Sequence, residues 1–127
     1  MEDKKQSGIL LVVEDNLGVR EVTKAMLERC GFSVLAAEDG EQGVRLFQEN
    51  SAEIRAALVD LIMPGIDGQT TIKRIRELQP NVKVILTSGH SETEAKQVFG
   101  ALGINGFIQK PFDIIQLSQK IRDVLED

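Results

Sequence analysis

Short apolar runs alternate with longer, mostly polar segments along the chain, and this alternation limits the fold more than any other feature. The runs cover residues 9–13, 34–37, 56–59, 82–87 and 107–108. Each segment between two runs is long enough for one helix and two short loops, as in the β-α-β units of a parallel sheet. Connections between parallel strands are nearly always right-handed. The sequence therefore predicts an α/β fold with a five-stranded parallel sheet.

The segments between the runs carry helical patterns. Apolar residues at spacings of three and four form stripes at Val19, Val22, Met26 and Cys30, and at Ile114, Leu117, Ile121 and Val124. Predicted N-caps are Asn16, Asp67 and Asp113, and predicted helix ends are Gly31 and Pro80. The helix over about 41–49 is the weakest, because Gly43 inside it costs roughly 1 kcal/mol relative to alanine. The central runs are continuously apolar, which predicts helices on both faces of a doubly wound sheet.

The composition limits the class of protein. With 127 residues the chain has the size of one domain, predicted over 9–127, after a polar N-terminal segment 1–8 that we interpret as a flexible start or linker stub. A net charge of −5 argues against a nucleic-acid-binding surface. The single cysteine rules out an internal disulfide and fits a reducing, cytoplasmic location. No apolar run approaches the ~18 residues of a membrane span, so we expect no membrane contact by this domain.

Three carboxylates stand where predicted strands end. Glu14 and Asp15 follow the first strand, Asp60 ends the third, and Lys110 follows the last. A parallel sheet gathers its strand ends at one edge, which is where such sheets bind ligands. Two like charges at ~4 Å repel by about 4 kcal/mol at an effective dielectric constant near 20, so unpaired acids would be costly there. A divalent cation together with one lysine relieves the repulsion, and that arrangement suits phosphoryl chemistry.

Four motifs occur in order along the chain. They are Val12-Val13-Glu14-Asp15-Asn16, the segment 59–68, Leu86-Thr87-Ser88-Gly89 and the segment 107–112. Through them the chain resembles a response-regulator receiver domain of two-component signalling, over about residues 9–125. The motifs around Ser88 and Lys110 are similar to those in receivers of hybrid sensor histidine kinases. The resemblance implies a flavodoxin-like receiver fold, with a five-stranded parallel sheet in the order 2-1-3-4-5 and five helices.

The resemblance also implies a role for four side chains. Asp60 matches the phosphoacceptor, and Lys110 matches the cationic partner of the resulting acyl phosphate. Ser88 matches the hydroxyl that moves to the phosphoryl group. Phe107 stands in the place of the switch aromatic, whose movement follows that of the hydroxyl.

A magnesium site and a cis peptide bond are implied in the same way. Glu14, Asp15 and Asp60 match the residues that hold Mg²⁺, with the backbone carbonyl of Ile62 as a further ligand. Glu14 is longer than the aspartate found in many members, and such a side chain often reaches the metal through water. The Lys110–Pro111 bond is implied to be cis.

The function implied is that of a phosphoacceptor receiver domain, which promotes its own phosphorylation and dephosphorylation. Asp60 would accept a phosphoryl group from the phosphohistidine of a histidine kinase or a histidine phosphotransfer protein. The domain would then change conformation through its fourth helix, fifth strand and fifth helix, a face through which receivers also form dimers. A hybrid histidine kinase is one parent protein that the motifs fit.

Other functions share parts of this pattern. A flavodoxin-like binding module needs a phosphate-binding loop rich in glycine and hydroxyl groups after the first strand, where this chain has Glu14-Asp15-Asn16-Leu17. A phosphohydrolase with an aspartate nucleophile needs a second acid two positions after it, where this chain has Ile62. A pseudo-receiver that serves only as a scaffold would lack Asp60 or Lys110, and this chain has both.

Overall fold

In the computed structural model, which describes residues 8–99 and 103–126, five strands form one parallel sheet in the order β2-β1-β3-β4-β5. The strands are β1 (Ile9–Val13), β2 (Ser33–Ala37), β3 (Ile54–Asp60), β4 (Lys83–Ser88) and β5 (Gly106–Gln109). The helices are α1 (Leu17–Arg29), α2 (Gly40–Asn50), α3 (Gly68–Leu78), α4 (Glu92–Phe99) and α5 (Ile114–Glu126). The predicted fold class and strand order are confirmed. Most of the predicted N-terminal segment lies outside the described residues, so its boundary stays a prediction.

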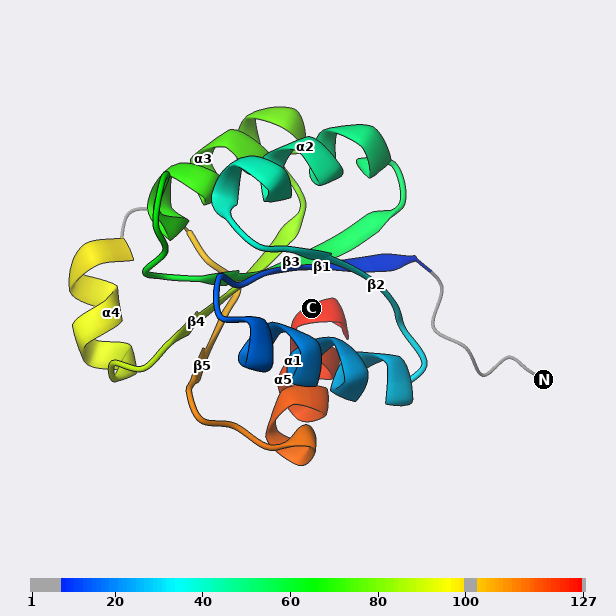
Figure 1. Cartoon of the computed structure of the whole chain (residues 1–127), viewed down its shortest axis with the longest axis vertical. Helices are drawn as coiled ribbons and strands as arrows, with labels where there is room; N and C mark the ends of the chain where they lie inside the picture. The colour runs from blue at the N-terminus through cyan, green and yellow to red at the C-terminus, as the bar shows by residue number, and fades with distance from the viewer. Residues whose placement is uncertain (1–7, 100–102, 127) are drawn as a thin grey trace.

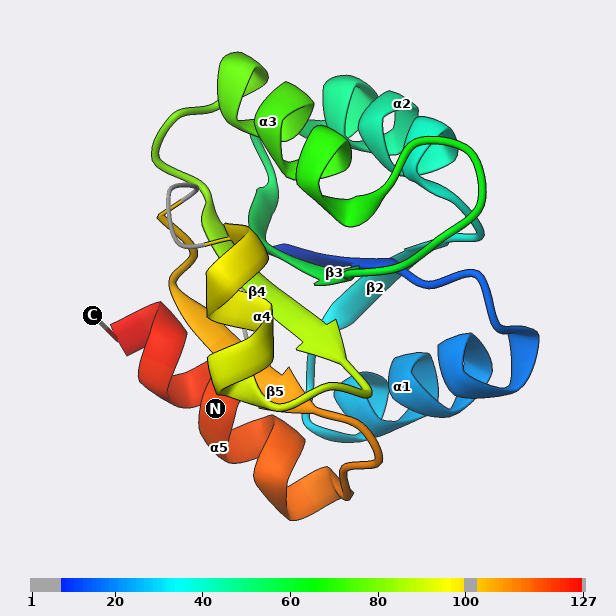
Figure 2. The same cartoon turned by 90° about the vertical axis from the view of Figure 1, so that its left-hand side faces the viewer.

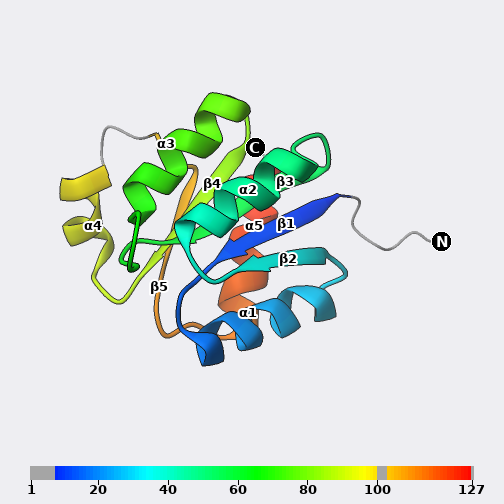
Figure 3. The same cartoon turned by 45° about the horizontal axis from the view of Figure 1, so that its top comes forward.

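Helices cover both faces of the sheet (Figures 1 and 3). Helices α2, α3 and α4 lie over one face, and α1 and α5 lie over the other. Alternate residues of each strand supply the two cores: Leu11 and Val13 pack toward α2 and α3, while Leu10 and Val12 pack toward α1 and α5. No helix within the described residues has both the length and the apolar character needed to cross a membrane.

Side-chain caps begin the helices where the sequence predicts them. The carboxylates of Asp67 and Asp113 and the amide oxygen of Asn16 accept hydrogen bonds from the backbone N–H three residues ahead, at 2.8–2.9 Å. The buried face of α1 matches the predicted stripe in part, since Met26 and Cys30 pack against the core. Thr23 and Leu27 are buried, whereas Val22 is 53% exposed. The prediction was wrong there because a search for apolar residues passes over a threonine on the packed face.

The start of β5 is fixed by a polar side chain that the sequence analysis did not single out. Asn105 donates its backbone N–H to the Val84 carbonyl at 2.8 Å, and its side-chain oxygen accepts from the Val84 N–H at 2.8 Å. Arg76 of α3 donates to the same oxygen at 2.9 Å. The amide therefore extends the pairing of β4 with β5 by one residue, directly ahead of Gly106 and Phe107.

Gly43, which the sequence marks as the weak point of α2, is a site of close packing. A Cβ atom placed there would lie 2.7 Å from Cγ2 of Val13, a buried residue of β1. Real Cβ contacts are longer than that, so either the valine or the helix would have to move. The glycine costs helix propensity but allows α2 to approach the sheet beside the strand that leads to Glu14.

We predict that Gly43→Ala destabilises the domain although alanine favours helices. Overpacking a core usually costs about 1–3 kcal/mol, which exceeds the ~1 kcal/mol of helix propensity gained. Gly18→Ala in α1 is the matched control, because the atom nearest to its added Cβ is 3.4 Å away and the exposed position leaves room for it. Urea unfolding should show Gly43→Ala less stable and Gly18→Ala as stable as the wild type or more so. A more stable Gly43→Ala would contradict the close packing.

Candidate functional site

The strands of the parallel sheet end at one edge (Figure 2). The predicted site residues stand at or just after these ends: Asp60 and Ser88 are the last residues of β3 and β4, and Lys110 follows β5. Glu14 and Asp15 follow β1 directly. The carboxylate oxygens that Glu14, Asp15 and Asp60 can offer to a cation all lie within 4.8 Å of one another. The cluster predicted from the strand ends is therefore present.

Lys110 lies between two buried acids. Its Nζ is 3.0 Å from Oε1 of Glu14 and 3.1 Å from Oδ1 of Asp60. Asp60 is only 5% exposed and Glu14 only 4%. Charged groups removed from water in this way need partners, and a lysine that contacts both carboxylates offsets part of their repulsion.

Burial changes the protonation of this group of residues. Loss of contact with water, followed by the negative charge of Glu14, raises the pKa of Asp60 to about 6, although Lys110 acts in the opposite direction. Burial alone would lower the pKa of Lys110, but its hydrogen bond to Glu14 and the charge of Asp60 outweigh that effect and raise it. The lysine is therefore charged at neutral pH, and without a cation Asp60 titrates close to neutrality.

The two acids after β1 are held differently. Oε1 of Glu14 accepts from Lys110, and Oε2 accepts from the backbone N–H of Asn16 at 3.1 Å. The Asp15 side chain is exposed, and none of the described residues donates a hydrogen bond to it. Carboxylate oxygens gathered at one point are the ligands that small divalent cations such as Mg²⁺ prefer. The cluster is consistent with Mg²⁺ binding.

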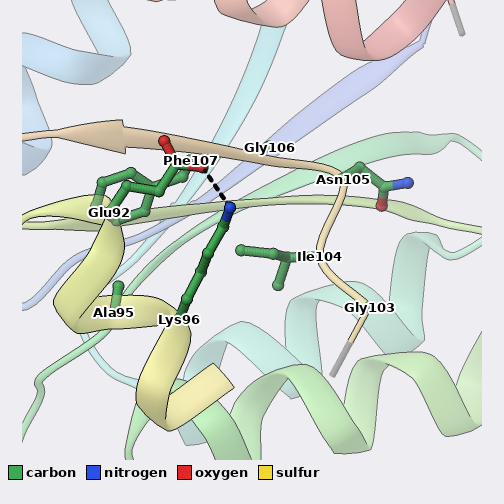
Figure 4. A pocket seen from close by; sticks show the side chains of 8 residues that line it. All are labelled: Glu92, Ala95, Lys96, Gly103, Ile104, Asn105, Gly106 and Phe107. Atoms are coloured by element: carbon green, nitrogen blue, oxygen red, sulfur yellow. Dashed lines mark ion pairs between the residues drawn. The ribbon is translucent and has the colours of Figure 1, made fainter. Parts of the chain in front are cut away.

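Ser88 and Phe107 lie just beyond the acids, on β4 and β5. Ser88 is buried, and its Oγ accepts from the backbone N–H of His90 at 3.0 Å. Phe107 is 7% exposed and packs in the core on the α4 side of the sheet. It also borders a pocket between α4 and β5, which is lined on the α4 side by Glu92 and Lys96, an ion pair at 3.5 Å within that helix (Figure 4).

An apolar groove of about 640 Å³ adjoins the acidic cluster on the side of α1. Lys110 lines one end of it, and the bond from Lys110 to Pro111 is cis. The groove is lined by Asn16, Gly18, Val19, Val22, Thr23, Met26, Lys110, Pro111 and Phe112. The sequence analysis missed this surface, because its apolar residues come from two segments far apart in the chain. Val22, which the core leaves exposed, lines this groove.

A family model described as the response regulator receiver domain matches residues 10–122. The chain belongs to this family. Its acidic pocket of Glu14, Asp15 and Asp60 is typical of phosphoacceptor response regulators. The receiver assignment and the predicted fold are thereby confirmed.

Among curated proteins, the sensor kinase CckA of Brucella abortus is 31% identical over 124 residues, which are 98% of this chain and 13% of that protein. The transcriptional regulatory protein CseB of Streptomyces avermitilis is 38% identical over 116 residues, 91% of this chain and 48% of that protein. The chain therefore spans less than half the length of these relatives.

Solved structures show the same fold. The receiver domain of the hybrid histidine kinase CckA has a TM-score of 0.79 and 35% identity, covering 93% of this chain and 99% of that one. CheY in a CheX-CheY-BeF3-Mg complex from Borrelia burgdorferi has a TM-score of 0.83 and 28% identity, covering 92% of this chain and 88% of that one.

We predict that Asp60→Asn stabilises the metal-free domain at pH 7.5. The wild-type carboxyl has a folded pKa of about 6 against an ordinary value of 3.8, so its proton stabilises the folded state below about pH 4 and that stability is lost as the pH rises through 6. The asparagine side chain of the variant is uncharged at all of these pH values, and Lys110 keeps its contact with Glu14. Its melting temperature should exceed that of the wild type by several degrees, since ~1 kcal/mol corresponds to about 4 °C for a domain of this size.

The advantage of the variant should shrink as the pH is lowered from 7.5 to 5, because the wild-type carboxyl then takes up its proton. It should also shrink on adding Mg²⁺, which stabilises only an intact site. A thermal-shift series over pH with and without the metal measures both effects. A variant less stable than the wild type in metal-free buffer at pH 7.5 would contradict the strained acidic cluster.

Proposed function

We propose that Asp60 is the phosphoacceptor and that it receives its phosphoryl group from a phosphohistidine of a histidine kinase or a phosphotransfer protein. One observation carries the proposal. The buried carboxylate of Asp60 lies at a strand end within a three-carboxylate cluster, with a lysine ammonium 3.1 Å away. An acid so placed has a nucleophilic oxygen beside both a cation site and a fixed positive charge, which phosphoryl transfer requires.

The proposed phosphoryl transfer needs no rearrangement of Asp60 or Lys110. An oxygen of the Asp60 carboxylate attacks phosphorus, the bond from phosphorus to the donor imidazole nitrogen breaks, and the imidazole leaves with the electron pair. The product is an acyl phosphate on Asp60. Lys110, which already contacts Asp60, is placed to bind a phosphoryl oxygen as the negative charge moves outward. Mg²⁺, when bound, supplies further positive charge to the phosphoryl oxygens.

For the cation we propose Asp15 and Asp60 as direct ligands, together with the backbone carbonyl of Ile62. Asp15 has both oxygens available, whereas both oxygens of Glu14 already accept hydrogen bonds. Glu14 therefore acts on the cation through water and holds Lys110 in place. The side chain of Ile62 is 63% exposed and apolar, so it cannot serve as the second acid of a phosphohydrolase.

We propose Ser88 and Phe107 as the switch. The Ser88 hydroxyl is buried at the end of β4, next to the strand that ends in Asp60, and can turn toward an oxygen of the phosphoryl group. Phe107 pairs in register with Leu86, two residues before Ser88, and borders the pocket beneath α4. Movement of the serine would leave space on the side of the sheet where the aromatic ring lies. Helix α4, β5 and α5 would carry the change to a partner or a second copy.

We propose that the phosphohistidine donor docks in the apolar groove beside Lys110. The groove begins at Asn16 and Lys110, at the edge of the acidic cluster, and continues over Val22 and Met26 of α1. An exposed apolar groove on a domain of net charge −5 favours a partner that offers an apolar helix face. A helix carrying the phosphohistidine could lie in the groove with its imidazole directed at Asp60. A cytoplasmic location of this exchange stays a prediction.

Phosphorylation of Asp60 can be tested directly. Incubation with acetyl phosphate and Mg²⁺ should add one phosphate to the intact protein by mass spectrometry. Asp60→Asn should gain none, because the amide cannot form the acyl phosphate. Labelling of that variant as complete as that of the wild type would falsify the assignment of Asp60.

The same sample tests the switch. Phosphorylation should move the amide resonances of Phe107 and of α5, which lie away from Asp60. Ser88→Ala should still take up the phosphate, but with smaller distant shifts. Full shifts in Ser88→Ala would show that another element carries the change.

The groove is tested with Val22→Glu, which places a charge on its apolar wall. Transfer from a phosphorylated histidine phosphotransfer protein that serves the wild type should slow about tenfold, equivalent to ~1.4 kcal/mol. Labelling by acetyl phosphate should stay within about twofold. Leu78→Glu is the matched control, since it adds the same charge at an exposed apolar residue at the far end of α3. If phosphoryl transfer slowed equally in both variants, or did not slow in Val22→Glu, the donor would dock elsewhere on the domain.

A further inference from the structure

Arg20 holds the short turn that carries two of the three acids. Its Nη1 donates to the backbone carbonyl of Glu14 at 3.0 Å and lies 3.4 Å from the carbonyl of Asp15. We propose that Arg20 is a positioning residue for the cation site, which keeps this turn in the conformation that directs both carboxylates toward Asp60. The inference rests on the proposed function and extends it to a residue outside the acidic cluster.

The turn needs a stabilising contact of this kind because its acidic side chains repel one another. Glu14, Asp15 and Asn16 are the only residues between β1 and α1, and the carboxylates of two of them lie within 4.8 Å of each other and of Asp60. The Glu14 side chain is held by Lys110 and by the Asn16 N–H. No described residue donates a hydrogen bond to the Asp15 carboxylate, so its position depends on the backbone that carries it.

The backbone of Glu14, the first residue of the turn, has two partners in neighbouring elements. The Glu14 N–H donates to the Ala37 carbonyl at the end of β2, at 3.0 Å. The Glu14 carbonyl accepts from Arg20, which is itself part of α1. The turn is thus fixed to the sheet on one side and to the helix on the other. Without the arginine, the Glu14 carbonyl, which belongs to the peptide group that leads into Asp15, would lose this partner.

The kind of contact that Arg20 makes allows its positioning role to be distinguished from an effect of its charge. The contacts that Arg20 makes here are to uncharged carbonyl oxygens, so the arginine occupies none of the carboxylate oxygens. The positive charge of the guanidinium opposes a nearby divalent cation. If Arg20 acted through its charge alone, removing it would tighten Mg²⁺ binding. If it acts by positioning, removing it weakens binding, so the two roles have opposite signs.

The experiment compares Mg²⁺ dissociation constants by isothermal titration calorimetry, because the chain has no tryptophan or tyrosine to report binding by fluorescence. Arg20→Met should raise the dissociation constant about tenfold. Arg29→Met is the matched control: it removes the same charge from an exposed site in the last turn of the same helix and should leave the constant unchanged or slightly lower. Asp60 labelling at saturating Mg²⁺ should recover to within about twofold of the wild type.

An unchanged or lower dissociation constant in Arg20→Met overturns the inference, even if that variant melts at a lower temperature. A change of the same size in Arg29→Met overturns it too. If Arg20→Met does not fold, Arg20→Lys is measured instead. A dissociation constant for Mg²⁺ equal to that of the wild type in Arg20→Lys would count against positioning by the guanidinium. Failure of wild-type Asp60 to take up phosphate would instead reject the proposed acceptor. It would leave the calorimetric comparison of Mg²⁺ affinity valid by itself.

Discussion

The contact of the Lys110 ammonium with the carboxylates of Glu14 and Asp60 is the interaction on which the site depends. It joins residues 96 positions apart in the sequence. The strand order places β4 between β3 and β5, so the lysine must reach across the end of β4. Its backbone N–H donates to the Ser88 carbonyl at 2.7 Å, and this hydrogen bond fixes the backbone from which the lysine side chain extends. Removing the ammonium would leave two buried acids beside a third without the positive charge that offsets their repulsion.

The same strand connects the acidic cluster with the pocket under α4. Lys110 and Phe107 are three residues apart on β5 and the segment that follows it, and Phe107 packs on the face that α4 covers. The start of this strand is held by Asn105 against Val84 and Arg76. In the proposed switch, a change in the contacts of Lys110 would therefore act on a short strand that is anchored at its other end. Any rearrangement would then be directed toward Phe107 and the pocket under α4 rather than into the rest of the sheet.

Most of the site could be predicted from the sequence because it depends on local patterns. A strand that ends in an acid is visible in the chain itself, and parallel pairing brings such ends together whatever the loops do. Gly43, Arg20 and Asn105 could not be assigned in this way. Each matters through a contact outside its own segment: Gly43 with Val13, Arg20 with the Glu14 carbonyl, and Asn105 with Val84 and Arg76. Part of the buried face of α1 was missed because Thr23 is buried without being apolar.

The surfaces on the two sides of the acidic cluster differ in a way that bears on how a donor approaches. On the α1 side lies the apolar groove that ends at Lys110. On the α2 side lies a hollow lined by four acids, Asp15, Glu38, Asp39 and Glu41, together with Pro64 and Gly65. A phosphoryl group carries negative charge, so the acidic side repels it while the lysine at the end of the groove attracts it. A donor that docks in the groove, as proposed, would therefore bring its phosphoryl group to Asp60 past Lys110. On that side, unlike the α2 side, no acidic hollow repels the negative charge of the group.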